Sequence, residues 1–258
     1  MRKLLWALAG LTAVYLVLPV FIVIPTSFSD SAFLEFPPKA WSLRWYENFF
    51  TDDTWLDSAV DSLQIAFQVT LVSLVLGTAA ALGMVRGRYP LRSLVSGLVM
   101  APILVPYVIV GLAVYAVFLR AGLTQTPVGF ILVHATLAVP YVIITVSSAL
   151  MSFDRRLEQA AMNLGAGPVT TFARVTLPLI APSLASGALF AFVTSFDEVV
   201  TSVFLSGPDL TTLPVRMWSG VRVQIDPTVA AVSSMLLMIT LALFGAAGLT
   251  RLILRRKA

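Results

Sequence analysis

Two adjacent acidic residues, Asp197 and Glu198, stand inside a long apolar stretch of the sequence. A charged side chain at the centre of a membrane costs roughly 2.5–3.5 kcal/mol, so such acids usually face a helix bundle or a water-filled path. On a continuous helix, Thr194 and Thr201 would share a polar stripe with Asp197. We therefore predict that Asp197, Thr194 and Thr201 line a path for a cationic or amine-bearing solute. The alternative is that both acids are structural and form hydrogen bonds with neighbouring helices.

Glu198 points about 100° away from Asp197 on the same predicted helix, so the two acids are not expected to share one role. The stripe of Glu198 contains Gly187 and Ala191, whose small side chains allow another helix to approach closely. We predict that Glu198, Gly187 and Ala191 contribute to helix packing.

Other residue types that support catalysis are absent or isolated. The chain has no cysteine, which excludes disulfides, thiolate metal sites and cysteine nucleophiles. His134 is its one histidine, so we expect a packed, hydrogen-bonded imidazole rather than a metal site or a His-Glu-x-x-His hydrolase. No phosphate-binding loop occurs, because none of the three lysines lies in a glycine-rich turn. We predict no catalytic residue, no metal site and no cofactor in this chain.

The composition is typical of a polytopic membrane protein. Hydrophobic residues make up 58% of the 258 positions and charged residues 12%, about half the charged fraction of a soluble domain. Because a membrane crossing needs ~20 apolar residues, we predict an all-α fold with six transmembrane helices in one membrane domain covering 1–258. The spans are predicted at about 4–24, 58–85, 93–119, 127–150, 181–205 and 227–250.

Charged residues between the spans predict the orientation. Twelve of the 17 lysines and arginines lie at the two termini, after the second span and in the loop after the fourth, whereas five lie on the opposite side. The positive-inside rule then places both termini in the cytoplasm. Trp41, Trp45, Tyr46 and Trp55 suit a segment along the outer membrane interface, in contact with lipid. The net charge of +4 does not predict nucleic-acid binding, because no basic cluster alternates with aromatic residues.

The loop at about 151–180 is the most polar sizeable segment on the predicted cytoplasmic side. Apolar residues spaced three and four apart, from Leu157 to Leu164, predict a short amphipathic helix. Gly165 stands where that helix would end in a left-handed residue, which glycine adopts without steric cost. Residues 169–175 are expected to form a second short helix. Pro178 and Pro182 are then expected to restart the chain, with Pro182 in the first turn of the next span. An ordinary polar connector would show the same local features.

The spacing of residues in this loop resembles the EAA loop of the permease subunits of ABC importers. The matching residues are Gln159-Ala160-Ala161, Gly165 and Val175-x-Leu177-Pro178. The family usually has Glu at the position of Gln159, and Glu158 lies one residue earlier in this chain. The resemblance implies a coupling segment that docks on an ATP-hydrolysing subunit and includes Glu158, Gln159, Ala160, Ala161, Gly165 and Pro178.

The resemblance also implies the rest of the assembly. It implies the type I ABC importer permease fold, in a bacterial inner membrane, for the whole chain. It further implies two ABC ATPase subunits that bind ATP and Mg, a second homologous permease subunit that forms a heterodimer with this one, and a periplasmic solute-binding protein.

Two further stretches, SFDEVV at 195–200 and TLPVRMW at 212–218, are similar to the spermidine/putrescine branch of these permeases. That similarity implies a polyamine-like solute, while opines and amino-acid derivatives are the alternative within the same architecture. Two alternatives come from other classes: a secondary transporter that uses the two acids as an ion relay, and a non-transporting membrane scaffold. A neighbouring gene for a P-loop ATPase would favour the importer over both.

Overall fold

A computed structural model describes residues 2–224 and 226–257, without the side chains of residues 19, 224 and 243–257. Regular structure in this part of the chain is helical apart from two isolated β-bridges, so the predicted all-α fold is confirmed. The helices form two compact units, which we describe separately. The central unit comprises Ser58–Val215, and the terminal unit comprises Met1–Asp57 and Arg216–Ala258. The prediction of one membrane domain stays a prediction.

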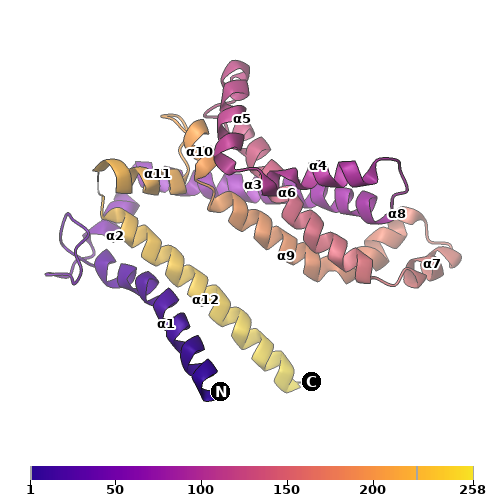
Figure 1. Ribbon diagram of the computed structural model, residues 1–258, viewed down its shortest axis with the longest axis horizontal. Coiled ribbons are helices and arrows are strands. Elements are labelled where there is room, and N and C mark those ends of the chain that lie inside the picture. Colours follow the sequence, from indigo (N-terminus) through magenta and orange to yellow (C-terminus); the bar gives the residue numbers. More distant parts are fainter. Residues whose placement is uncertain (1, 225, 258) are drawn as a thin grey trace. The chain divides into compact units, whose positions relative to one another are not determined.

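The central unit is built around α6, which packs along α9 (Figure 1). Its elements are α3 (Asp53–Arg86, from Ser58 onward), α4 (Arg92–Leu104), α5 (Tyr107–Ala121), α6 (Pro127–Ser152), α7 (Arg156–Asn163), α8 (Pro168–Thr171), the π-helix η1 (Phe172–Thr176), α9 (Leu177–Phe196) and α10 (Val200–Leu205). Glycines let α3 and α9 approach α6 closely. A Cβ built on Gly77 of α3 would lie 2.7 Å from the Val142 side chain, and one on Gly187 of α9 would lie 2.8 Å from Thr145 Oγ1. α6 is therefore the helix against which the candidate site is positioned.

The predicted third span is two helices rather than one bent helix. α4 and α5 meet at an angle of 101°, with a break at Val105 and Pro106. Val105 is extended, with φ −82° and ψ 129°, and Pro106 is the N-cap of α5. Proline disfavours helical geometry in the residue before it and has no N–H, so α4 ends there. Pro102, by contrast, is accommodated inside α4.

The chain does not restart at Pro178 or Pro182, and that prediction is wrong. α8 continues through η1 into α9, so one helical segment runs over Pro168–Phe196. The Leu177 N–H donates to the Phe172 carbonyl, five residues back. This wider turn precedes Pro178, which has no N–H and whose ring would clash with a carbonyl in a regular turn. The π-helix therefore lets the helix continue past the proline.

The terminal unit contains α1 (Arg2–Ser27), α2 (Arg44–Thr51), η2 (Gly220–Gln224) and α12 (Thr228–Lys257), together with the end of α11 (Leu213–Ser219). α1 and α12 lie side by side (Figure 1). Asn48 of α2 donates to Thr228 Oγ1 at 2.9 Å. Arg216 donates to Thr54 Oγ1 at 2.6 Å and lies over the Trp55 ring, 5.4 Å from its centroid. Polar contacts and an arginine–aromatic contact thus connect the ends of these helices.

Several described helices are long and apolar enough to cross a membrane. Among the residues that were described, four meet that test: Arg2–Ser27, Asp53–Arg86, Pro127–Ser152 and Pro168–Phe196. The α4–α5 pair makes a fifth, broken crossing, and the described apolar part of α12, Thr228–Ala242, coincides with the start of the predicted sixth span. The protein is therefore a multi-pass membrane protein. The predicted orientation also used four basic residues near the end of the chain. Their side chains lie outside the described residues: Arg251, Arg255, Arg256 and Lys257.

Candidate functional site

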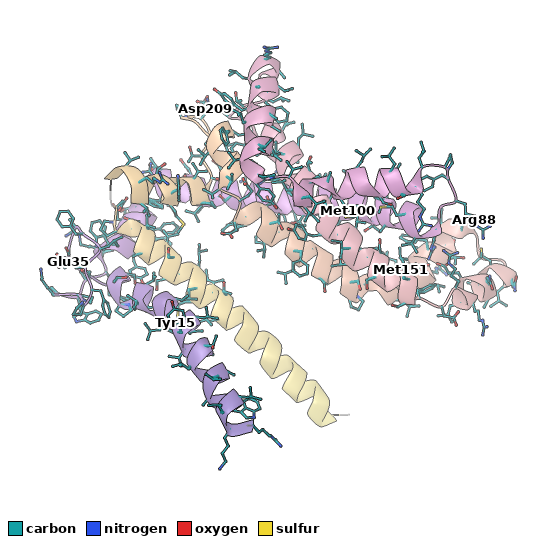
Figure 2. The ribbon with its side chains drawn as sticks, in the orientation of Figure 1. Tyr15, Glu35, Arg88, Met100, Met151 and Asp209 are labelled. Carbon is teal, nitrogen blue, oxygen red and sulfur yellow. The ribbon has the colours of Figure 1, made fainter. Side chains whose placement is uncertain are left out.

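The predicted coupling segment lies at one end of the central unit. Figure 2 shows Arg88, in the connector between α3 and α4, at the same end as α7 and α8. Asp209, which follows α10, lies toward the opposite end of this unit (Figure 2). That the two segments lie on opposite sides of a membrane stays a prediction.

Gly165 forms the turn of the coupling segment. It follows α7 with a φ of 91°, so the predicted left-handed conformation is confirmed. Its N–H donates to the Met162 carbonyl at 2.9 Å, and the Ala166 N–H donates to the Ala161 carbonyl at 3.1 Å. These two bonds form a Schellman C-cap. A Cβ built on Gly165 would meet nothing within 4 Å, so the backbone conformation, not space, requires glycine.

Apolar side chains around this turn are exposed. Leu164 is 89% exposed and Val169 is 81% exposed, and no residue of α7 is buried. The residues predicted to dock divide into the exposed Gln159, Ala160, Gly165 and Pro178 and the partly buried Glu158 and Ala161. Exposed apolar side chains beside a defined turn suit contact with another protein. The role of these residues in coupling stays a prediction.

Glu158 is engaged inside the chain. Its Oε1 accepts a hydrogen bond from Arg86 Nη2 at 2.7 Å and another from the Thr176 hydroxyl. The Glu158 side chain is 12% exposed, so its carboxylate faces α3 and η1 rather than the docking surface. Sequence reasoning used Arg86 only for orientation and did not single out Thr176. No sequence pattern connects Glu158 with a residue 72 positions earlier.

The predicted fifth span is interrupted at the two acids. α9 ends at Phe196, and α10 begins at Val200. The prediction of a continuous helix over 181–205 is therefore wrong, and helical spacing does not place the side chains that follow Phe196. The physical reason lies in the Glu198 side chain, which satisfies the backbone N–H groups at the start of α10 and so stabilises a new helix start.

Glu198 is a buried acceptor for the first turn of α10. Its Oε1 accepts from the Thr201 N–H at 2.8 Å, and its Oε2 accepts from the Ser202 N–H at 2.9 Å. The Thr201 and Ser202 hydroxyls donate to Oε2 at 2.7 and 3.0 Å. Because the unpaired N–H groups of its first turn give a helix start partial positive charge, a carboxylate there is stabilising. Glu198 therefore holds α10 in place, and its Oε2 lies 3.6 Å from Nε2 of His134 on α6.

His134 of α6 bridges the break between α9 and α10. Its Nδ1 lies 2.9 Å from Ser195 Oγ on α9, and its Nε2 lies 3.0 Å from Ser202 Oγ on α10. The Ser202 hydroxyl donates its one hydrogen to Glu198, so Nε2 is the donor in the contact with Ser202. The imidazole is buried and hydrogen-bonded on both sides, as the sequence predicted. One side chain of α6 thus connects both halves of the broken span.

Asp197 is the exposed residue of the break. It is the C-cap of α9, and its N–H donates to the Val193 carbonyl at 3.0 Å. Thr194 is partly buried, whereas Thr201 is fully buried against Glu198. Thr201 therefore does not share a face with Asp197. The translocation path through Asp197 and Thr194 stays a prediction.

Gly187 and Ala191 are buried on α9, which packs against α6. A Cβ on Gly187 would lie 3.5 Å from the Val142 Cα as well as close to the Thr145 hydroxyl. A larger side chain at position 187 would therefore push α9 away from α6.

The contacts define what this centre can do chemically. The buried Glu198 and His134 are engaged with neighbouring groups, whereas the Asp197 carboxylate is exposed. Within the described ranges, no group of three or more His, Asp or Glu side chains could hold a metal ion. The centre is suited to attract a cation to the Asp197 carboxylate, and the hydrogen bonds of Glu198 and His134 hold the helix ends beside it.

Comparison with known proteins identifies a family and several relatives. The family described as "Binding-protein-dependent transport system inner membrane component" matches residues 73–257. The spermidine/putrescine transport system permease protein PotC of Haemophilus influenzae is 33% identical over 229 residues, covering 89% of each chain. The putrescine transport system permease protein PotI of Escherichia coli is 35% identical over 237 residues, covering 89% of this chain and 83% of that protein.

A solved structure has the same fold. It is that of a bacterial ABC transporter involved in the import of the acidic polysaccharide alginate, and it matches with a TM-score of 0.74. The match covers 97% of this chain and 95% of the other at 14% identity. At that identity the likeness concerns the fold alone, and it confirms the predicted ABC importer permease fold.

Proposed function

Because this chain belongs to the family of binding-protein-dependent transport system inner membrane components, we propose that it moves a cationic, amine-bearing solute such as a polyamine. One observation carries the proposal: the exposed Asp197 carboxylate at the break between α9 and α10, in a chain whose relatives are named as spermidine/putrescine permeases. A carboxylate attracts an ammonium group, and its desolvation cost is partly offset while water remains in the path.

The proposed transport is ATP-driven and uses alternating access. Two ABC ATPase subunits bind ATP and Mg, a second, homologous permease forms a heterodimer with this one, and a periplasmic binding protein delivers the solute. Closure of the ATPase dimer moves the coupling segment, and the helix bundles switch between inward-open and outward-open states. Both termini and the coupling segment face the cytoplasm, which follows from the positive-inside rule.

The break in the fifth span supports a role in the path. Irregular backbone at membrane depth is tolerated where it is buried in protein or lines a water-filled cavity. Glu198 and His134 hold the two helix ends, and this leaves Asp197 as the exposed acid on the connecting residues. The solute passes this carboxylate between the two permeases. An opine or amino-acid derivative with an amine group is the second candidate, because the same carboxylate would attract it.

The test is uptake by the complete complex, reconstituted in liposomes with its ATPases, partner permease and binding protein. We expect ATP-dependent uptake of radiolabelled putrescine or spermidine, and competition by opines or amino acids only if they are also substrates. Asp197→Asn should lower uptake roughly tenfold or more, because that ratio corresponds to the free energy of one hydrogen bond to a charged group. Asp209→Asn, which changes an exposed acid outside the break, is the matched control. Normal uptake by Asp197→Asn, or an anionic cognate solute, would contradict the cation path.

A further inference from the structure

One carboxylate connects the coupling segment to a helix that is distant in the sequence. Glu158 Oε1 lies 2.7 Å from Nη2 of Arg86, the last residue of α3, and the same oxygen accepts the Thr176 hydroxyl of η1. The Arg86 guanidinium also lies 6.0 Å from the ring centroid of Phe153, where α6 ends. These contacts join α3, α7 and η1 at one point. We call Glu158, Arg86 and Thr176 the Glu158 link.

Apolar packing does little to hold α7. None of its residues is buried, and its apolar Leu157 and Met162 are 48% and 46% exposed. The Glu158 link is sheltered by comparison. The Glu158 and Arg86 side chains are 12% and 27% exposed, and Thr176 is fully buried. Charge-assisted hydrogen bonds in such sheltered positions are short and geometrically defined, so the Glu158 link determines where α7 lies.

The path of the backbone makes this contact important for movement. α7 is connected through the chain to α6 on one side and to α8 and α9 on the other. No short backbone segment connects α7 to α3, since 72 residues separate Arg86 from Glu158. If the Glu158 link persists while α7 moves, then α3 must move with it. Removing one partner would leave the other charge partly buried and uncompensated, so separation during movement is unfavourable.

We infer that Glu158 and Arg86 are positioning residues through which displacement of the coupling segment is transmitted to α3. The inference rests on the proposed function, because an ATPase must displace α7 for the Glu158 link to transmit anything. It assigns Glu158 an internal role and leaves contact with the partner to the exposed residues of the segment. Thr176 orients the carboxylate by donating to the same oxygen that accepts from Arg86.

The direct test measures whether α3 and α7 move as one body. The chain has no cysteine, so spin labels can be placed on Arg88→Cys, in the connector after α3, and on Arg155→Cys, at the start of α7. We expect the distance distribution between the labels to be the same in the nucleotide-free and ATP-trapped complex. With Arg86→Gln added, the distribution should broaden or shift on ATP binding. A shift in the complex with an intact Glu158 link would overturn the inference.

The functional test measures solute molecules imported per ATP hydrolysed by the complete complex. Arg86→Gln should lower this ratio about fivefold or more, the lower end of coupling between linked sites. Arg88→Gln, which removes an exposed arginine two positions away, is the matched control. The exchanged pair Arg86→Glu with Glu158→Arg should recover most of the ratio lost in either single variant. Recovery requires the contact itself and would not follow from a general loss of folded protein.

The outcomes separate this inference from the proposed function. If the unmodified complex does not couple uptake to ATP hydrolysis, the proposed function fails. If the unmodified complex is coupled and Arg86→Gln is coupled equally well, only the inference fails. Should Arg86→Gln yield no folded complex, Thr176→Val removes the orienting bond without leaving an unpaired charge. If that variant imports the normal number of solute molecules per ATP, and its label distance is the same with and without ATP, the inference is contradicted.

Discussion

Replacing Glu198 by Gln tests whether its carboxylate holds the start of α10. The substitution keeps the shape of the side chain but replaces one acceptor oxygen by an NH2 donor. In the structure Oε1 accepts the Thr201 N–H, while Oε2 accepts the Ser202 N–H and both hydroxyls. Whichever oxygen is replaced, an NH2 group then faces one of these backbone N–H groups, donor against donor.

The expected loss of stability follows from these contacts. One buried backbone N–H loses its acceptor, which costs ~1–3 kcal/mol. The backbone bond that remains goes to a neutral amide oxygen and is weaker by about 1 kcal/mol than a bond to a carboxylate. The two hydroxyls can rotate and accept from the NH2 group, so they add little. The free energy of unfolding should therefore fall by about 2–4 kcal/mol, which corresponds to a Tm lower by roughly 4–16 °C.

The assay is thermal unfolding of the purified protein in detergent, followed by intrinsic tryptophan fluorescence. Asp197→Asn is the matched control, because the neighbouring acid is exposed and its change should alter stability by less than about 0.5 kcal/mol. Glu198→Gln should also reduce the yield of folded complex. If Glu198→Gln unfolds at the same temperature as Asp197→Asn, the carboxylate does not hold α10 and the reasoning is refuted.

Two further predictions concern the coupling segment. Gly165→Asp should reach the membrane but abolish transport and weaken co-purification with the ATPase, because a φ of 91° strains any other residue by roughly 1–3 kcal/mol and the charge enters the docking surface. Wild-type transport by this variant would show that the turn is not the coupling element. A cysteine at Gly167 should be shielded from an impermeant maleimide in intact cells, whereas one at Asp209 should react, and a permeant reagent should label both. Reaction at position 167 with the impermeant reagent would contradict the predicted orientation.

Local sequence alone determined the helical, membrane-spanning character of this chain. Long apolar runs and spacings of three and four depend only on neighbouring residues, so the spans and α7 could be predicted. Gly165 could be predicted for the same reason, since its left-handed conformation completes a C-cap made within six residues of chain. The packed, hydrogen-bonded imidazole of His134 also followed from residue type and placement.

The prolines show where local reasoning ends. Pro106 breaks a span, whereas Pro102 lies within a helix thirteen residues long. Pro178 follows a π-helix and Pro182 lies inside α9, so neither restarts the chain. A proline removes one N–H in every case. Whether the helix continues depends on how the neighbouring turns and helices accommodate it, and the residue type does not encode that.

The partners of the buried polar groups were decided only by the tertiary structure. His134 contacts serines 61 and 68 positions away, and Glu158 contacts an arginine 72 positions away. Periodicity carries no information about such pairs, because they exist only after the helices have packed. The break at Asp197 also depends on the tertiary structure, because the sequence predicts an unbroken apolar helix there. The first turn of α10 donates hydrogen bonds to the Glu198 carboxylate, and His134 of α6 lies beside that carboxylate. These contacts make two helices more stable than one continuous helix.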